Sequence, residues 1–363
     1  MTDRVNFTKR ELSLLLTNLI IAKMLFSYPR FLFKTSGNAA WIEAFYMSLI
    51  VFGMLLLSFL FFKYTGNRSI IELSEMVGGM FLKIVVSTLV SLIILSNIAT
   101  EMRMFAESVK IILLPKTQIE LIMILFAITV TIGACSGLGA LATINSLFLP
   151  VCLFFLAALV LVLIPAYNIN NIFPIMGTGA GDVFLRSFRD MSGFSDLIAL
   201  NLLLPHCSAI SIVKKSGKTA VLLGGIVLFS ICLSYALIYP YPYSTEFLLI
   251  PYQLSRMVRA GEYFQRFEAF FEFVWSITQL IYSSLYVFLL ADIWRKTFRL
   301  RYTKPLIPCF VAIMSLISFE QSTIIEVLDT TYNFKAPLVP IAYLLPIMVP
   351  LFYIISRRDK NES

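Results

Sequence analysis

Long apolar segments alternate with short polar links along almost the whole chain, and this pattern predicts membrane-spanning helices. A helix needs about 20 apolar residues to cross the hydrocarbon core of a bilayer. The ten candidate segments lie at about 10–30, 39–62, 80–100, 119–134, 141–164, 183–205, 220–239, 267–291, 305–319 and 337–355. The pattern therefore predicts an all-α integral membrane protein with ten transmembrane helices, and a short amphipathic helix outside the core at about 247–261.

The first apolar segment is interrupted by polar residues. Lys23 lies far from either end of the segment, and Pro29 follows Ser27 and Tyr28. A lysine inside a membrane span costs a few kcal/mol and is by default a functional candidate facing a cavity or a partner. Proline removes a backbone donor and disfavours helix at the residue before it. The segment is therefore predicted to be a discontinuous helix.

The sixth segment is interrupted in the same manner, because Ser192, Gly193, Phe194 and Ser195 lie near its middle. A glycine flanked by serines is a poor helix interior. The two breaks occupy corresponding positions in two halves of five helices, at about 10–165 and about 183–355. Five is odd, so the second half enters from the opposite face. One domain over residues 1–363 is predicted, a 5+5 inverted repeat with a solute site near the bilayer midplane.

Composition narrows the function classes. The chain is 59% hydrophobic and 14% charged, and it has a single histidine, His206. No P-loop, GxSxG motif or metal-ligand spacing occurs, so we expect no catalytic residues, metal site or cofactor. His206 allows proton coupling, or is an interfacial histidine at a helix end.

The cysteines are odd in number, show no CxxC spacing and are predicted to be buried thiols. They are Cys135, Cys152, Cys207, Cys232 and Cys309.

The formal net charge of +8 reports membrane topology and does not indicate a nucleic-acid partner. With the N-terminus inside, the inner loops hold about 16 Lys and Arg residues and the outer loops about 9. Both termini are therefore predicted to be cytoplasmic, and an acidic outer loop at Glu320–Asp329 fits. The basic cluster from Arg295 to Lys304 is interpreted as a topology determinant attracted to anionic lipid. Nothing resembles a cleavable signal peptide.

Candidate binding residues gather at the two breaks, where unwound backbone offers N–H groups and carbonyls to a solute. Lys23 presents a cation to a carboxylate solute, or fills the place of a bound ion. The structural alternatives are an ion pair with Asp196, Glu272 or Glu101, or snorkelling of the lysine toward water. The other residues predicted at the breaks are Ile21, Ala22, Met24, Ser192, Gly193 and Phe194.

Two further segments carry polar residues on one face. In the eighth segment, polar and aromatic positions recur every three or four residues, and the carboxylates among them favour the bundle interior. These positions are Glu268, Glu272, Trp275, Thr278 and Tyr282. The alternative is a packing face, with Glu268 paired to Arg259 or Arg266. In the third segment, Ser96, Asn97 and Thr100 form a cluster that binds a solute or holds helices together.

Five motifs resemble one known family. They are MLFSYPR at 24–30, LLP followed by KT at 113–117, NIFPIMGTG at 171–179, SGF at 192–194 and GEYFQRFEAFFEFVW at 261–275. The chain resembles the endospore germination permeases, the B subunits of spore germinant receptors, within the amino acid-polyamine-organocation superfamily. Members usually carry small residues at the first break, where this chain has Ile21, Ala22 and Lys23.

The resemblance implies a LeuT-like fold and recognition of a small nutrient, commonly an amino acid. It also implies assembly with A-type and C-type subunits in the inner membrane of the spore, and it maps Thr278 and Tyr282 onto the solute-facing part of the eighth helix. The expected function is that of a germinant receptor subunit that binds such a nutrient and triggers germination. The alternatives are an amino acid transporter coupled to protons or sodium, and a scaffold subunit that binds no solute.

Overall fold

The computed structural model describes residues 7–26, 28–258, 267–321, 323, 326–327 and 338–362, without the side chains of residues 339 and 357–362. Every regular element in these ranges is helical. Five described helices are long and apolar enough to cross a membrane, and a shorter apolar helix covers Pro340–Ser356. The five are Tyr28–Thr65, Ile70–Ile112, Ile119–Ala166, Ile210–Ile238 and Phe267–Thr297.

The first segment is discontinuous, as the sequence predicts. Helix α1 (Lys9–Met24) begins at a capping box, in which Thr8 and Glu11 satisfy each other's free backbone N–H groups. The helix ends at Met24, and a second helix, α2 (Tyr28–Ser36), begins one residue before Pro29. Proline is tolerated there because the first N–H groups of a helix have no partner inside it.

Glycines set the bends in the next helices. Helix α3 (Ala40–Thr65) leads into α4 (Ile70–Ile112), which kinks at Gly78 and Gly79. The φ angle of Gly79 is 65°, in the left-handed region that glycine enters without a steric penalty. The stretch from Gly79 to Ile112 contains the predicted third segment and its extension toward Glu107.

The predicted fourth and fifth segments lie in α5 (Ile119–Val162), which is divided at Gly137. Gly137 has a φ angle of 86°, so the chain turns there without the clash that a Cβ atom would cause. The eighth and ninth predicted segments are the helices α10 (Phe267–Thr297) and α11 (Ile307–Glu320).

The sixth segment has no continuous α-helix. After the short α6 (Ala180–Phe184), the chain forms a 3₁₀ helix, η4 (Arg186–Leu197), before α7 (Ile198–Leu203) and a final 3₁₀ turn, η5 (Leu204–His206). Long 3₁₀ runs are uncommon because their hydrogen-bond geometry is poorer, and they often mark functional sites. The interruption predicted at Ser192–Ser195 is therefore confirmed.

Three helices complete the chain. Helix α8 (Ile210–Ile238) begins ten residues before the predicted seventh segment. The short α9 (Ile250–Arg256) lies within the predicted amphipathic stretch, and α13 (Leu338–Glu362) covers the tenth segment.

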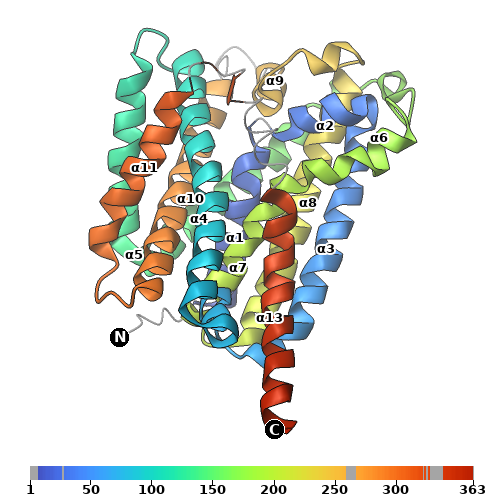
Figure 1. Cartoon of the computed structure of the whole chain (residues 1–363). Coiled ribbons are helices and arrows are strands. Elements are labelled where there is room, and N and C mark those ends of the chain that lie inside the picture. The colour runs from blue at the N-terminus through green and yellow to red at the C-terminus, as the bar shows by residue number, and fades with distance from the viewer. Residues whose placement is uncertain are drawn as a thin grey trace.

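The helices pack in two groups (Figure 1). The first helix group contains α1, α2, α3, η4 and α8, and the second helix group contains α4, α5, α10 and α11. Helix α13 packs against α3 of the first group and α4 of the second, while α1 contacts α5 and α10 across the boundary. The two interrupted segments therefore both belong to the first group and face the second.

Small residues of α8 let the first helix group pack closely. A Cβ atom at Gly224 would lie 2.5 Å from the side chain of Ile20 in α1, and one at Gly225 would lie 2.8 Å from Ser48 in α3. In a membrane, apolar burial gives no net drive between helices, so close backbone approach through small residues carries more of the association. These glycines bring the broken first segment against α8.

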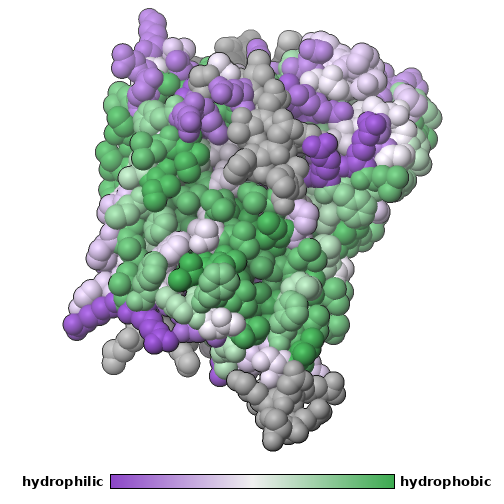
Figure 2. All heavy atoms as spheres, viewed as in Figure 1, coloured by the Kyte–Doolittle hydropathy of each residue, from purple (hydrophilic) through white to green (hydrophobic). Residues whose placement is uncertain are grey.

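On the face shown in Figure 2, apolar side chains form a broad band, with hydrophilic side chains above and below it. The start of α1 and the later part of α13 lie on one face. Ser216 near the start of α8 donates to the carbonyl of Lys9 over 3.2 Å, and Arg68 donates to the Tyr353 hydroxyl over 3.1 Å. Asn67, beside Arg68, donates to the carbonyl of Cys207 just before α8. The protein is therefore an integral membrane protein whose first and last helices share a face.

Some predictions fall outside the described residues: Arg259, Arg266, residues 261–266 of the longest motif and half of the loop at 320–329. All five cysteines are free. Cys152, Cys207 and Cys232 are buried, but Cys309 is exposed and Cys135 is partly exposed, so the prediction of buried thiols is wrong for these two.

Candidate functional site

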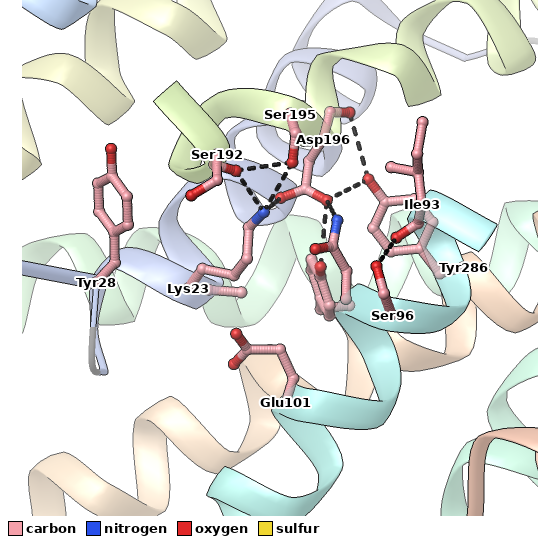
Figure 3. A network of polar contacts seen from close by, with 12 residues as sticks. Lys23, Tyr28, Ile93, Ser96, Glu101, Ser192, Ser195, Asp196 and Tyr286 are labelled. Atoms are coloured by element: carbon pink, nitrogen blue, oxygen red, sulfur yellow. Dashed lines mark hydrogen bonds and ion pairs between the residues drawn. The ribbon is translucent and has the colours of Figure 1, made fainter. Parts of the chain in front are cut away.

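A buried ion pair joins the two interrupted segments (Figure 3). The Nζ atom of Lys23, in the last turn of α1, lies 2.5 Å from Oδ2 of Asp196 in η4. The lysine is 6% exposed and the aspartate 1%. Lys23 also donates to the carbonyl of Ser192 over 3.1 Å and to Oγ of Ser195 over 3.3 Å. Of the three acids considered from the sequence, Asp196 is the partner of Lys23.

The other carboxylate oxygen of Asp196 accepts three hydrogen bonds. The donors are Nδ2 of Asn97 in α4 at 3.2 Å, the hydroxyl of Tyr282 in α10 at 3.2 Å and the hydroxyl of Tyr286 at 2.6 Å. Removing a charge from water costs several kcal/mol, so a buried carboxylate persists only with close compensation. Asp196 has that compensation on both of its oxygens.

The donors come from both helix groups. Lys23 and Asp196 lie in the first group, whereas Asn97, Tyr282 and Tyr286 lie in the second. Asp196 therefore links the two groups at the point where the 3₁₀ helix interrupts the sixth segment. Any relative movement of the groups must stretch or replace these hydrogen bonds.

A second link uses the end of α1. The Ala22 carbonyl accepts a hydrogen bond from Nε1 of Trp275 over 3.2 Å and another from Nε2 of Gln279 over 2.8 Å. The last carbonyls of a helix lack intrahelical partners, which leaves this oxygen free to bind side chains. Gln279 also donates to Glu101 in α4 over 3.0 Å. Helices α1, α4 and α10 are thus joined at one buried point.

Gly193 lies where the two broken segments meet. A Cβ atom at this position would lie 2.2 Å from the ring of Tyr28, the first residue of α2. The Tyr28 hydroxyl donates to the carbonyl of Asp190, one turn earlier in η4. The glycine is therefore needed for the close approach of the Tyr28 ring. This contact joins α2, the second helix of the first segment, to the sixth segment.

The residues predicted at the first break lie next to the site, but their backbone is helical. The sequence predicted unwound backbone at Ile21, Ala22, Lys23 and Met24, and this is wrong because α1 continues to Met24. In the last turn, the Ala22 carbonyl is bound by side chains of α10. The side chains of Ile21, Ala22, Met24 and Phe194 are fully buried in the core.

Only some residues of the predicted polar stripe on α10 contact the site. Trp275 and Tyr282 contact the site, whereas the Thr278 hydroxyl donates to the carbonyl of Trp275 in its own helix. The Thr278 carbonyl accepts a hydrogen bond from Asn18 of α1 over 3.2 Å, so this residue helps pack the two helices. Glu272 lies apart from the ion pair and accepts a hydrogen bond from Ser108 over 2.6 Å.

In the third segment, Asn97 alone of the predicted cluster contacts Asp196 among the described interactions. Ser96 and Thr100 donate to carbonyls of their own helix, at Ile93 and Ser96. Tyr286 and Gln279 were not predicted, although a signal for Tyr286 exists. It follows Tyr282 by four residues and so extends the polar stripe of α10 by one turn.

Aromatic side chains close the site in this structure. The Phe26 ring stacks on the Trp275 indole with centroids 4.9 Å apart, and Phe105 lies on the same indole at 6.0 Å. Tyr282 and Phe194 have no exposed surface. The charged groups are therefore enclosed between two helix groups and shielded from water, where electrostatic attraction is strong.

Gln279 offers a test of the second link. Replacing it with methionine, which has a similar volume, removes two buried hydrogen bonds and leaves the acceptors at Ala22 and Glu101 with fewer donors. We expect a loss of about 1–3 kcal/mol in the free energy of unfolding. Thermal unfolding in detergent measures this loss, with exposed Gln118→Met as the control. Equal stability of the two variants would show that the Gln279 bonds contribute nothing.

Solved structures with the same fold are membrane transporters. One is Mhp1, a nucleobase-cation-symport-1 family transporter, in a closed conformation with bromovinylhydantoin bound. Its TM-score to this chain is 0.66 at 14% sequence identity, and the match covers 95% of this chain and 80% of Mhp1. The inward-facing conformation of Mhp1 gives a TM-score of 0.56 at 14% sequence identity, and the match covers 92% of this chain and 75% of Mhp1. The chain therefore has a LeuT-like fold, which it shares with these structures.

Sequence comparison identifies the family. The chain belongs to the spore germination protein family, the spore permeases, whose profile matches residues 6–326. The resemblance found in the sequence motifs is therefore confirmed. No curated protein matches the sequence at a significant level.

Proposed function

We propose that this protein is the membrane subunit of a spore germinant receptor, and that it binds a small nutrient, an amino acid, to trigger germination. The observation that carries the proposal is the Lys23–Asp196 ion pair, enclosed where two interrupted segments meet the second helix group. Family membership supports the germination role. Charged residues inside a membrane bundle mark solute and ion sites more often than packing sites.

The ion pair suits a zwitterionic solute. An amino acid carries an ammonium and a carboxylate group close together, which are the two groups that Lys23 and Asp196 present to each other. A bound amino acid would place its carboxylate at Lys23 and its ammonium at Asp196, so both buried charges would stay compensated. Asn97 and Tyr286 donate hydrogen bonds to one oxygen of Asp196. These bonds would hold the Asp196 carboxylate in place while the solute ammonium replaces Lys23 as its partner.

Binding would act on the contact between the helix groups. The solute shifts an equilibrium between two packings of the bundle only by the difference between its affinities for them. Insertion between Lys23 and Asp196 separates the first-group cation from the carboxylate that the second group holds. The resulting movement would be passed to A-type and C-type receptor subunits, which we propose as partners in the inner membrane of the spore.

The proposed topology has ten crossings in two inverted halves, at about 10–165 and about 183–355, within a single domain. The crossings are α1 with α2, α3, α4, the two parts of α5, η4 with α7, α8, α10, α11 and α13. Both termini would be cytoplasmic, which agrees with the shared face of α1 and α13 and with the excess of Lys and Arg on that side.

A second candidate function is secondary transport of an amino acid, coupled to protons or sodium. The observation that favours it is the fold, since Mhp1 is a transporter. Proteoliposomes containing the purified protein and a panel of radiolabelled amino acids separate the two functions. The receptor proposal predicts saturable binding without accumulation inside the liposomes, and loss of the amino acid germination response when the gene is deleted. Accumulation that is abolished by an uncoupler would establish transport instead.

A further inference from the structure

A second polar region lies away from the ion pair, at the face where α1 begins. A cavity of about 800 Å³ opens between the kink of α5, the end of α10 and the link to α11. That link, orange at the lower left of Figure 1, coincides with hydrophilic atoms in Figure 2. His206 lines the cavity. The carbonyl of the next residue, Cys207, accepts a hydrogen bond from Asn67 in the short loop between α3 and α4.

The cavity is positively charged. Arg295, Arg301 and Lys304 line it, and the single carboxylate among the lining residues is Asp292. Asp292 is already compensated: its oxygens lie 3.0 Å from Nε2 of His206, 2.6 Å from Nη2 of Arg295 and 3.0 Å from Nζ of Lys296. The charges of Arg301 and Lys304 therefore face the cavity without a neutralising acid among its described lining residues.

His206 belongs to the wall of this cavity. Its ring is 4% exposed, and its Nδ1 atom has no hydrogen-bond partner among the described residues. Buried polar atoms are nearly always hydrogen-bonded, so an orphaned one points to a missing partner. The Nε2 atom is bound to Asp292, so His206 and Arg295 together occupy the one carboxylate among the lining residues.

The lining also has an apolar part, formed by Ala134, Leu138, Phe288 and Pro305. We propose that this cavity binds the phosphate group of an anionic ligand, with Arg301 and Lys304 as the phosphate-binding residues. Arginine and lysine are the usual partners of phosphate oxygens, and basic pockets between membrane helices bind lipid head groups. The phosphate could belong to an anionic phospholipid or to a soluble phosphate compound.

The test uses the delipidated full-length protein in neutral detergent. Thermal unfolding is measured against increasing phosphatidylglycerol, phosphatidylcholine or inorganic phosphate, and native mass spectrometry counts retained lipid. The test variant is Arg301→Gln/Lys304→Gln. The matched control is Lys215→Gln/Lys218→Gln, which removes the same charge from exposed positions near the start of α8, outside the cavity lining.

We expect phosphatidylglycerol to raise the unfolding temperature more than phosphatidylcholine does. Its apparent affinity should fall at least fivefold in the cavity variant and less than twofold in the control. Protection by inorganic phosphate at millimolar concentration, lost in the same variant, would support the proposal with a soluble source. Protection by phosphatidylglycerol alone would support it with a lipid source. Equal losses in both variants, or no protection by either probe, would overturn it.

Discussion

Replacing Lys23 with methionine is expected to lower the free energy of unfolding by about 3–5 kcal/mol, because the change leaves the buried Asp196 carboxylate without its cation. Asp196 is 1% exposed, so water cannot take the place of the ammonium group. The Asp196→Asn variant should lose a similar amount, since it strands the lysine charge instead. Unfolding in mixed micelles of mild detergent and sodium dodecyl sulfate measures both losses.

The double variant Lys23→Met/Asp196→Asn separates the charge effect from general damage. It removes both charges, so its stability should recover by at least 2 kcal/mol relative to the sum of the single losses, within the range of coupling seen for contacting residues. Additive losses would mean that the two side chains do not interact in the folded protein. The ion pair would then contribute nothing to the stability of the folded protein.

Gly193→Ala is expected to destabilise the protein by about 1–3 kcal/mol through overpacking. The added Cβ atom would lie 2.2 Å from the Tyr28 ring, so the ring or the 3₁₀ helix must move. Because the Tyr28 hydroxyl is bonded to the carbonyl of Asp190, the ring has little freedom to withdraw. Thermal unfolding and the germination response of spores carrying the variant are the measurements.

Gly53→Ala in α3 is the matched control, since no atom lies within 4 Å of a Cβ atom placed there. It should be neutral or slightly stabilising, as alanine favours helix over glycine. The combination Gly193→Ala/Tyr28→Leu tests the assigned cause, because a smaller side chain leaves room for the methyl group. A combined loss as large as the sum of both single losses would show that the Tyr28 ring is not what Gly193 accommodates.

The existence of the two breaks could be predicted from the sequence because their causes are local. Pro29 and the serine-flanked Gly193 disfavour helix wherever they lie. The position of the first break could not be predicted as well. The last turn of α1 is held by Trp275 and Gln279, which bind the Ala22 carbonyl from a segment more than 250 residues away.

The partner of Lys23 also could not be predicted from the sequence. A lysine within a membrane span requires compensation, and Asp196, Glu272 and Glu101 all met that requirement. The choice depends on which helices are neighbours: η4 packs against α1, whereas Glu272 faces Ser108 of α4. Periodicity along α10 correctly placed Trp275 and Tyr282 in the interior, because a helix presents every third or fourth residue to one side.

Residues in short connections gave the weakest signals. His206 was recognised as the single histidine at a helix end, but its pairing with Asp292 joins η5 to the end of α10. The two residues lie 86 positions apart in the sequence, and a hydropathy pattern does not specify which helix ends meet. The basic cluster at Arg295–Lys304 predicts topology, and the structure adds the cavity that three of its basic residues line.

Equilibrium binding of labelled amino acids to the full-length protein in nanodiscs tests the central proposal most directly. Each of the twenty amino acids is titrated against the wild type and against Lys23→Met/Asp196→Asn. The account predicts saturable binding of at least one amino acid to the wild type, weakened at least a hundredfold in the double variant while other residues at the helix interface remain unchanged. Undiminished binding to the double variant, or no binding to the wild type in this panel, would contradict it.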